Sequence, residues 1–377
     1  MIKIGITGQH GFIGTSLYNT LGLFPDKYFR VSFQKEYFNA PDKFDDFVRE
    51  CDVIVHLAAV NRHSDLNVLY QSNIELVETL TASLKRTNSK ASVLFSSSTQ
   101  EENDNLYGRS KREGRKIFEK WAQEEGGKFF GLIIPNVFGP FGRPFYNSVV
   151  ATFCHQLNQK ETPQIQIDSL VNLIYVGDLV SEIIDIINIQ STLPEGFSQI
   201  KAIESTTQIT VSELLSLLQD FKGRYLDKGE IPHINNSFEL NLFNTFRSFI
   251  PNITYFPVHF IKHSDPRGSF SEVIRSNNGG QTSFSITKPG ITRGNHFHTR
   301  KIERFAVVQG KARIQLRRIG TGDILNFDLD GEQPAYVDMP IWYSHNITNT
   351  GSEELITIFW INEFYNPEDP DTYFENV

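Results

Sequence analysis

Cysteine and long apolar runs are both scarce in this sequence. Of its 377 residues only Cys51 and Cys154 are cysteines, and they lie far apart without a CxxC spacing. A disulfide framework is therefore not expected, and a reducing compartment suits the chain. The longest apolar runs, such as 53–60 (VIVHLAAV), fall far below the roughly 18 residues of a membrane span. A strand pattern already begins at residue 2, where a signal peptide would stand, so we expect a cytoplasmic protein without a membrane partner.

Dense positive charge is also lacking. The formal net charge is -8, and the nearest approach to a basic run, 111–116 (KREGRK), is typical of the solvated face of a helix. We therefore expect no nucleic-acid partner. An apolar content of 39% and a charged content of 21% are typical of a globular protein. The chain is longer than a domain with a single hydrophobic core usually is, so we expect two domains.

The first part of the chain alternates between strand patterns and helix patterns. Short apolar stretches rich in β-branched residues predict strands, and stretches with apolar residues at helical spacing separate them. This alternation predicts an α/β, Rossmann-like, doubly wound parallel sheet. The predicted strands are 2–7, 28–33, 52–59, 92–98 and 128–134, and the longer predicted helices are 69–87 and 107–125.

The pattern changes between residues 225 and 255. This stretch is polar and rich in turn residues, and its segment 237–251 (SFELNLFNTFRSFIP) predicts a short connecting helix. Beyond it, short strands follow one another between turns, which predicts a small antiparallel β-barrel or sandwich. We therefore expect one domain over residues 1–247 and a second over residues 248–377.

Three glycines directly follow the first predicted strand. Gly8, Gly11 and Gly14 form a GxxGxxG turn that leads into a predicted helix. Glycines let the backbone approach a pyrophosphate, and the helix N-terminus supplies free N–H donors. The turn therefore predicts a dinucleotide site, the alternative being a plain glycine turn.

The end of the second predicted strand indicates which dinucleotide is bound. An NAD site usually has an acidic residue here for the ribose 2′-hydroxyl, but this chain has Phe33, Gln34 and then Lys35. A cation suits a 2′-phosphate, so we expect NADP(H) with Lys35 as its contact. The alternative is that Lys35 is a solvated surface lysine.

A tyrosine and a lysine four residues apart form the candidate catalytic pair. Tyr107 and Lys111 share one face of a predicted helix. A neighbouring ammonium is expected to lower the tyrosine pKa, which would make Tyr107 a general acid for a carbonyl oxygen. Ser98, at the end of a preceding strand, would polarise the same oxygen. The alternative is a surface aromatic residue beside a lysine.

These motifs together resemble the extended short-chain dehydrogenase/reductases that act on nucleotide sugars. The matching segments are 7–14 (TGQHGFIG), 52–59 (DVIVHLAA), 95–98 (FSSS), 107–111 (YGRSK), 135–140 (PNVFGP) and 174–180 (IYVGDLV). The resemblance implies a cofactor site formed by the glycine turn, Phe12, Ile13, Leu57, Ala58, Ala59, Tyr107 and Lys111, and a substrate contact at Asn136. The family often has an arginine where this chain has Ile133. Whatever that arginine contributes is therefore absent from this chain or is supplied by another residue.

A cluster of metal-ligating residue types lies in the second predicted domain. His296 and His298 are two apart, so in a strand they point to the same face, and Glu303 follows. Segment 290–310 resembles the first cupin motif at every fixed position, and 340–349 resembles the second one, with Trp342 in place of a glycine. The resemblance implies an all-β, RmlC-like jelly roll. His296, His298, Glu303 and His345 would then hold a divalent metal, for which zinc is a suitable choice. The alternative is a set of hydrogen-bonded barrel residues without a metal.

Segments 265–272 (DPRGSFSE) and 293–298 (RGNHFH) are also similar to sugar-nucleotide 3,5-epimerases. That similarity implies that Arg267 and Arg293 bind substrate. It gives His296 a second possible role, as a base. His298 stands where those enzymes usually lack a histidine, which favours a metal. Lys301 and Tyr343 are further acid/base candidates, the alternative being exposed barrel residues.

The order of the two domains resembles the CapF/WbjC family of capsular-polysaccharide and O-antigen enzymes over essentially the whole chain. That resemblance implies a homodimer with two activities on a UDP-linked 4-keto-6-deoxy amino sugar. The cupin would epimerise C3, and the reductase domain would reduce the C4 ketone with NADPH, giving UDP-2-acetamido-2,6-dideoxy-L-talose. Two rival interpretations remain. One is a 4-epimerase that holds NAD permanently and uses the cupin as a binding or dimerisation module. The other is a non-catalytic sensor of these ligands.

Overall fold

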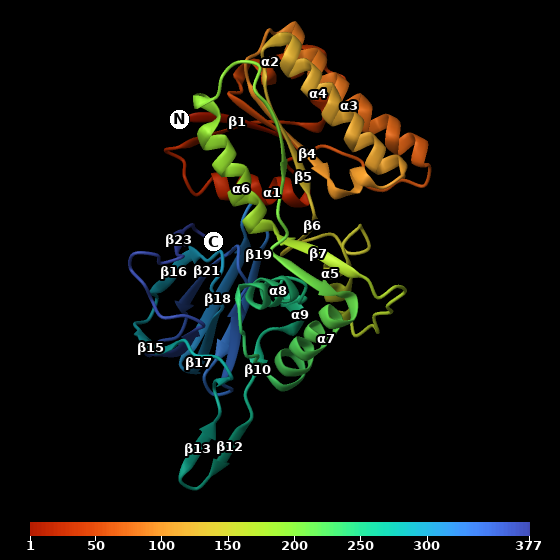
Figure 1. Ribbon diagram of the computed structural model, residues 1–377. Coiled ribbons are helices and arrows are strands. Elements are labelled where there is room, and N and C mark those ends of the chain that lie inside the picture. Colours follow the sequence, from red (N-terminus) through yellow and green to blue (C-terminus); the bar gives the residue numbers. More distant parts are fainter. The chain divides into compact units, whose positions relative to one another are not determined.

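The computed structural model describes residues 1–377, which form two compact units (Figure 1). The first unit comprises Met1–Thr152 and Asp168–Val211, and the second comprises Phe153–Ile167 and Ser212–Val377. The expected domain boundary between residues 247 and 248 stays a prediction. In the structure, the chain from Ser212 onward packs with the second unit, so the compact unit is larger than the predicted second domain.

A six-stranded parallel sheet forms the centre of the first unit, as the strand and helix alternation predicts. Its strand order is β2-β1-β3-β4-β5-β8, and every neighbouring pair is parallel. Strands of such a sheet are covered on both faces, and β3 accordingly has all four residues buried. The strands are β1 (Ile2–Thr7), β2 (Tyr28–Val31), β3 (Val53–His56), β4 (Ser92–Ser98), β5 (Lys128–Ile134) and β8 (Ser198–Ala202).

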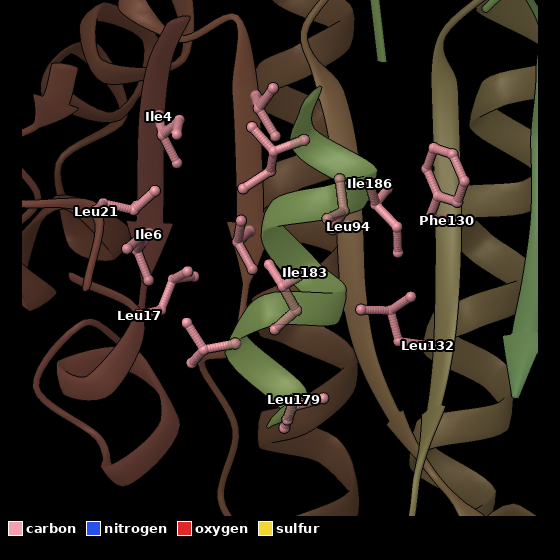
Figure 2. Close-up of a cluster of buried hydrophobic side chains, with 14 of the residues drawn as sticks. Ile4, Ile6, Leu17, Leu21, Leu94, Phe130, Leu132, Leu179, Ile183 and Ile186 are labelled. Atoms are coloured by element: carbon pink, nitrogen blue, oxygen red, sulfur yellow. The ribbon is translucent and has the colours of Figure 1, made fainter. Parts of the chain in front are cut away.

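Helices cover both faces of this sheet. On one face, α1 (Phe12–Leu21) and α6 (Val176–Ile189) bury Leu17, Leu179 and Ile183 against strand residues such as Ile6 and Leu132 (Figure 2). On the other face, α2 (Pro41–Glu50), α3 (Leu66–Arg86) and α4 (Leu106–Glu125) pack on an aromatic-rich cluster. A small sheet in the first unit consists of β6 (Asn136–Phe138), β7 (Leu170–Tyr175) and β9 (Thr207–Thr210). The short helices of this unit are η1 (Lys35–Asn39), η2 (Thr99–Glu102) and η3 (Gln190–Thr192), and α5 (Val149–Asn158) begins in the first unit and ends in the second.

Two antiparallel five-stranded sheets form the core of the second unit, as predicted for its C-terminal part. The strand orders are β11-β20-β17-β22-β15 and β19-β18-β21-β16-β23. Side chains from both sheets, among them Val307, Val337, Ile314 and Ile347, share one buried cluster. The strands are β11 (Val258–His259), β15 (Gln281–Thr287), β16 (Thr292–Phe297), β17 (Glu303–Gln309), β18 (Lys311–Arg318), β19 (Ile324–Asp330), β20 (Ala335–Met339), β21 (Tyr343–Asn349), β22 (Leu355–Ile361) and β23 (Tyr373–Phe374).

Smaller elements complete the second unit. The predicted connecting helix is present as α8 (Ser237–Arg247). A two-stranded hairpin, β12 (Lys262–Asp265) with β13 (Gly268–Ser271), extends from this unit (Figure 1). The others are α7 (Val211–Phe221), η4 (Lys222–Leu226), α9 (Asn252–Tyr255), β10 (Glu230–Ile231) and β14 (Arg275–Ser276). None of the helices combines the length and the apolar character that crossing a bilayer would require.

A buried ionic network explains why residues before 248 pack with the β-sheets. Arg304 on β17 makes a bidentate ion pair with Asp338 on β20, with nitrogen–oxygen distances of 2.7 and 2.9 Å. The hydroxyl of Tyr225, from η4, donates to the same carboxylate. Arg247, the last residue of α8, donates to the carbonyl of Met339 at 3.0 Å. A buried charge needs all its partners, so η4 and α8 complete the environment of this ion pair.

The network makes the stability of the second unit depend on Tyr225. Tyr225→Phe removes a donor from a buried carboxylate, which should lower the free energy of unfolding of this unit by about 1–3 kcal/mol. Urea unfolding followed by circular dichroism would measure the loss. Tyr37→Phe, which removes a half-exposed hydroxyl in the first unit, is the control. An equal midpoint for the two variants would contradict the role given to Tyr225.

Candidate active site and candidate metal centre

The glycine turn after β1 lies against the end of β3 without room for side chains. Gly8 has a φ of +78°, and a Cβ on it would lie 2.8 Å from the backbone nitrogen of Ala58. A Cβ on Gly14 would lie 2.3 Å from the carbonyl oxygen of Gly8. No side chain caps the N-terminus of α1 at Gly11. Its first N–H groups therefore stay available to an anion such as a pyrophosphate.

The structure brings the other predicted cofactor residues to the same edge of the sheet. Leu57, Ala58 and Ala59 follow β3 and are half-buried. Asn73 of α3 holds the next residue, Val60, by accepting from its N–H at 2.7 Å and donating to its carbonyl at 3.1 Å.

The start of α1 and the end of β2 complete this edge of the sheet. Phe12 and Ile13 open α1 and are half-buried. The side-chain amide of Gln9 donates to the carbonyl of Phe33 at 2.9 Å, so the glycine turn is joined to the end of β2. Lys35 follows two residues later and is exposed.

Lys111 is fully buried and oriented by the backbone. Its ammonium donates to the carbonyl oxygen of Ser96 at 2.9 Å and lies 5.8 Å from the centroid of the Tyr107 ring. Burial lowers the pKa of Lys111 to about 8. Ser98 ends β4, and its hydroxyl oxygen accepts from the N–H of Gln100 at 3.2 Å. Because accepting uses a lone pair, the hydroxyl hydrogen of Ser98 is left to donate.

The expected lowering of the Tyr107 pKa is wrong for this structure. Burial, with a smaller contribution from Tyr146, raises the pKa of Tyr107 to about 12. Burial raises this pKa because it removes the charged phenolate from water. Tyr107 is therefore held as the neutral phenol at neutral pH, which is the form a general acid needs.

Sequence reasoning missed the group that holds this site together. Glu101 is buried, and its carboxylate accepts from Arg115 of α4 at distances of 2.8–3.1 Å and from the hydroxyl of Ser97. These contacts fasten η2 between β4 and α4 and thereby set the spacing of Ser98 and Tyr107. Only the fold brings Glu101 and Arg115 together, so no local pattern could have identified the pair.

Four residues of the second unit form the predicted metal-ligand cluster. His296 on β16, His298 just after it, Glu303 at the start of β17 and His345 on β21 offer ligand atoms that all lie within 4.8 Å of one another. His296 and His345 are direct partners in the β16–β21 register. One carboxylate oxygen of Glu303 lies 3.2 Å from the Nε2 of His298 and 3.0 Å from the Nε2 of His345.

Backbone carbonyls fix the tautomers of two of these histidines. The Nδ1 of His298 lies 2.6 Å from the carbonyl oxygen of Asp371, and the Nδ1 of His345 lies 3.0 Å from that of Tyr343. A carbonyl can only accept, so each Nδ1 carries a hydrogen and a neutral ring turns an Nε2 lone pair toward Glu303. The Nε2 of His345 is buried and faces the Glu303 carboxylate oxygen at 3.0 Å. Lone pairs directed at a carboxylate are stable only with a cation or a proton between them, and these nitrogen and oxygen donors suit zinc or a similar divalent ion.

The pKa shifts describe how Glu303 and the histidines of the cluster compete for protons. Burial opposes the charged form of Glu303, but contacts with His298 and His345 outweigh it and hold the carboxyl pKa well below its usual range. For His298, burial is likewise outweighed, here by the Glu303 carboxylate, so the His298 pKa is raised. For His296, burial and then the neighbouring histidines lower the pKa to about 4, which leaves the ring neutral with a lone pair to offer.

Several other predicted site residues have different surroundings. Arg267 is exposed at the turn of the β12–β13 hairpin, where it pairs with Asp265 at 2.6 Å. Arg293 on β16 donates to the hydroxyl of Thr287 at 3.0 Å. The ammonium of Lys301 donates to the carbonyl of Pro370 at 2.6 Å and is directed at the C-terminal segment.

The roles of Tyr343 and Asn136 stay predictions. Tyr343 shares a face of β21 with His345, and burial raises the Tyr343 pKa. Asn136 opens β6 and is exposed.

Comparisons with known proteins match both units. Residues 4–191 match the NAD dependent epimerase/dehydratase family, and residues 263–373 match the polysaccharide biosynthesis C-terminal domain. A UDP-2-acetamido-2,6-beta-L-arabino-hexul-4-ose reductase from Pseudomonas aeruginosa is 33% identical over 99% of this chain and 98% of its own length. The crystal structure of the capsular polysaccharide assembling protein CapF from Staphylococcus aureus is 35% identical, covers 99% of this chain and 100% of its own, and has a TM-score of 0.61.

A more distant structure, RMD from Pseudomonas aeruginosa complexed with NADPH, shares the fold of the first unit. It is 18% identical, with a TM-score of 0.56, and covers 66% of this chain and 99% of its own. The fold and the sites thus define a dinucleotide-binding domain of the epimerase/dehydratase class, followed by an antiparallel β domain of polysaccharide biosynthesis. The chain belongs to the family of CapF-like proteins that combine these two domains.

The close contact at the glycine turn predicts a strong effect of one added methyl group. Gly14→Ala places a Cβ against the Gly8 carbonyl and should weaken NADPH binding at least about ten-fold, or about 1.4 kcal/mol. NADPH fluorescence titration would measure it. Gly223→Ala, where a Cβ has nothing within 4 Å, is the control. Unchanged NADPH affinity in a folded Gly14→Ala protein would exclude this turn as the cofactor site.

Proposed function

We propose that this protein is a bifunctional nucleotide-sugar enzyme of capsule or O-antigen synthesis. The second unit epimerises C3 of UDP-2-acetamido-2,6-dideoxy-4-ketohexose. The first unit reduces the C4 ketone with NADPH, giving UDP-2-acetamido-2,6-dideoxy-L-talose on the route to UDP-N-acetyl-L-fucosamine. The observation that carries the proposal is the pair of half-buried Tyr107 and buried Lys111, together with a bare glycine turn, in a chain similar over its whole length to a protein named as a hexul-4-ose reductase.

The residues of the first unit suit a ketone reduction. NADPH, when bound, supplies hydride to C4. Tyr107 gives its phenolic proton to the ketone oxygen, and the raised pKa keeps that proton in place until the oxygen becomes basic. The hydroxyl of Ser98 donates to the same oxygen. Lys111, held by the Ser96 carbonyl, stabilises the phenolate that forms.

The second unit suits proton transfer at C3. The C3 proton lies α to the C4 ketone and is therefore acidic. A divalent metal held by His296, His298, Glu303 and His345 would supply Lewis acidity at the ketone oxygen. Tyr343, on the same face of β21 as His345, is the acid/base group of this proposal. Arg293 and Asn136 are kept as substrate contacts, Arg293 in the second unit and Asn136 in the first.

Two variants separate the two activities. In D2O without NADPH, the wild type should exchange the C3 hydrogen of the 4-keto UDP-sugar. Tyr107→Phe should keep this exchange and lose ketone reduction by about 10²-fold or more. His298→Ala should lose the exchange and still reduce a ketone that is already epimerised.

NMR of the sugar measures the exchange of the C3 hydrogen, and NADPH absorbance measures the reduction of the ketone. Absence of net NADPH oxidation by the wild type would instead support a 4-epimerase, and full reduction by Tyr107→Phe would remove Tyr107 from the mechanism.

A second prediction concerns the choice between NADPH and NADH. Lys35 is exposed just beyond the end of β2, so Lys35→Glu replaces a cation suited to a 2′-phosphate with an anion suited to a ribose hydroxyl. The ratio of kcat/KM for NADPH to that for NADH should fall about ten-fold or more, which is about 1.4 kcal/mol. Lys43→Glu on the exposed face of α2 is the control of equal charge change. An equal NADPH-to-NADH ratio of kcat/KM in both variants would show that Lys35 does not distinguish the two cofactors.

A further inference from the structure

We propose that the C-terminal segment positions His298 as a metal ligand, with Asp371 as the positioning residue. This inference rests on the metal site of the proposed function. The term C-terminal clamp denotes Asp371, the turn Thr299–Lys301 and the Lys301 ammonium. None of these residues offers an atom to the ligand cluster, so the clamp acts through the orientation of His298.

The carboxylate of Asp371 organises the turn that follows His298. It is 2% exposed, and each of its oxygens accepts two hydrogen bonds. One oxygen accepts from the N–H of Thr299 at 3.0 Å and from its hydroxyl at 2.7 Å. The other accepts from the N–H groups of Arg300 and Lys301, both at 3.0 Å. The Asp371 carboxylate thus accepts from three consecutive backbone N–H groups that precede it by 70 or more positions in the sequence.

The backbone of the same residue holds the imidazole. The carbonyl oxygen of Asp371 accepts from the Nδ1 of His298 at 2.6 Å. The φ of Asp371 is +39°, in the left-handed region that few non-glycine residues adopt, and the four bonds of its carboxylate hold this conformation. The carbonyl therefore points at His298 only while the side chain is anchored. With Nδ1 bound as a donor, the ring presents Nε2 to the cluster.

Further contacts fasten the segment along the strand that carries His296. β23 pairs with β16, with Phe374 opposite His296. The N–H of Glu375 donates to the carbonyl of Asn295 at 3.0 Å. The Lys301 ammonium donates to the carbonyl of Pro370 at 2.6 Å and lies 3.6 Å from Glu363. Lys301 thus holds the residue before Asp371, which replaces its expected role as an acid or base.

The test is metal affinity of the full-length protein, measured by titration of the metal-free enzyme with Co²⁺ and by competition for Zn²⁺ with a chelator. Groups that orient a metal-binding histidine typically change the affinity 10–100-fold. Asp371→Ala should therefore weaken binding about 10–100-fold and change the Co²⁺ visible spectrum. Asp371→Asn keeps only one oxygen for two pairs of donors, so its affinity should fall between those of the wild type and Asp371→Ala.

Controls separate positioning from general stability. Asp369→Ala removes an exposed carboxylate of the same segment that pairs with Arg300 at 2.9 Å, and it should leave the metal affinity unchanged. NADPH affinity should be unchanged in every variant. If Asp371→Ala does not fold, Lys301→Met tests the same clamp and should weaken metal binding several-fold.

Two outcomes overturn the inference, and they are distinguishable. If the wild type binds neither Co²⁺ nor Zn²⁺, the proposed metal site fails and the clamp fails with it. If the wild type binds metal and the Asp371 variants bind it equally well while only the melting temperature of the metal-free protein falls, the segment is structural and the positioning role is wrong.

Discussion

The constraint on which the second unit depends is a carboxylate that faces two imidazole nitrogens. The Nδ1 atoms of His298 and His345 are committed to backbone carbonyls, so their Nε2 atoms both face the carboxylate of Glu303. Three electron-rich groups in a buried space repel one another unless a cation or protons lie between them. The antiparallel pairing of β16 with β21, and the start of β17, bring these residues together, so the sandwich imposes this need for a cation or a proton.

Both units use the same physical device to orient their reactive nitrogens. In the first unit the carbonyl of Ser96 holds the Lys111 ammonium, and in the second the carbonyls of Asp371 and Tyr343 hold two histidines. The carbonyls of Ser96 and Tyr343 belong to β4 and β21 and are fixed by their strands, whereas the carbonyl of Asp371 is fixed by the hydrogen bonds of its own carboxylate. The chemistry of each site therefore depends on short segments such as 96–98 and 370–371.

Features of the fold and of the sites could be predicted where they depend on residues close together in the sequence, and could not where they depend on distant ones. The strands β1, β4 and β5 and the helix α4 follow from local periodicity. His296, His298 and Glu303 follow from their spacing along one strand and turn, whereas His345 was expected only from the cupin resemblance. The Tyr107 pKa could not be predicted, because the spacing to Lys111 indicates a charge but not the burial that outweighs it. Glu101 and Asp371 were missed for a related reason, since their partners lie far away in sequence.

The surroundings of His296 bear on its two proposed roles, metal ligand and base. Burial and the two neighbouring histidines lower its pKa to about 4, so the ring is neutral at neutral pH and has a free lone pair. Its ring centroid lies 4.6 Å from that of His345 and 5.0 Å from that of His298. A proton taken by His296 would therefore add positive charge beside a bound divalent cation, whereas ligation shares that charge. The geometry thus favours His296 as a ligand and gives the proton transfer to a group outside the cluster, such as Tyr343.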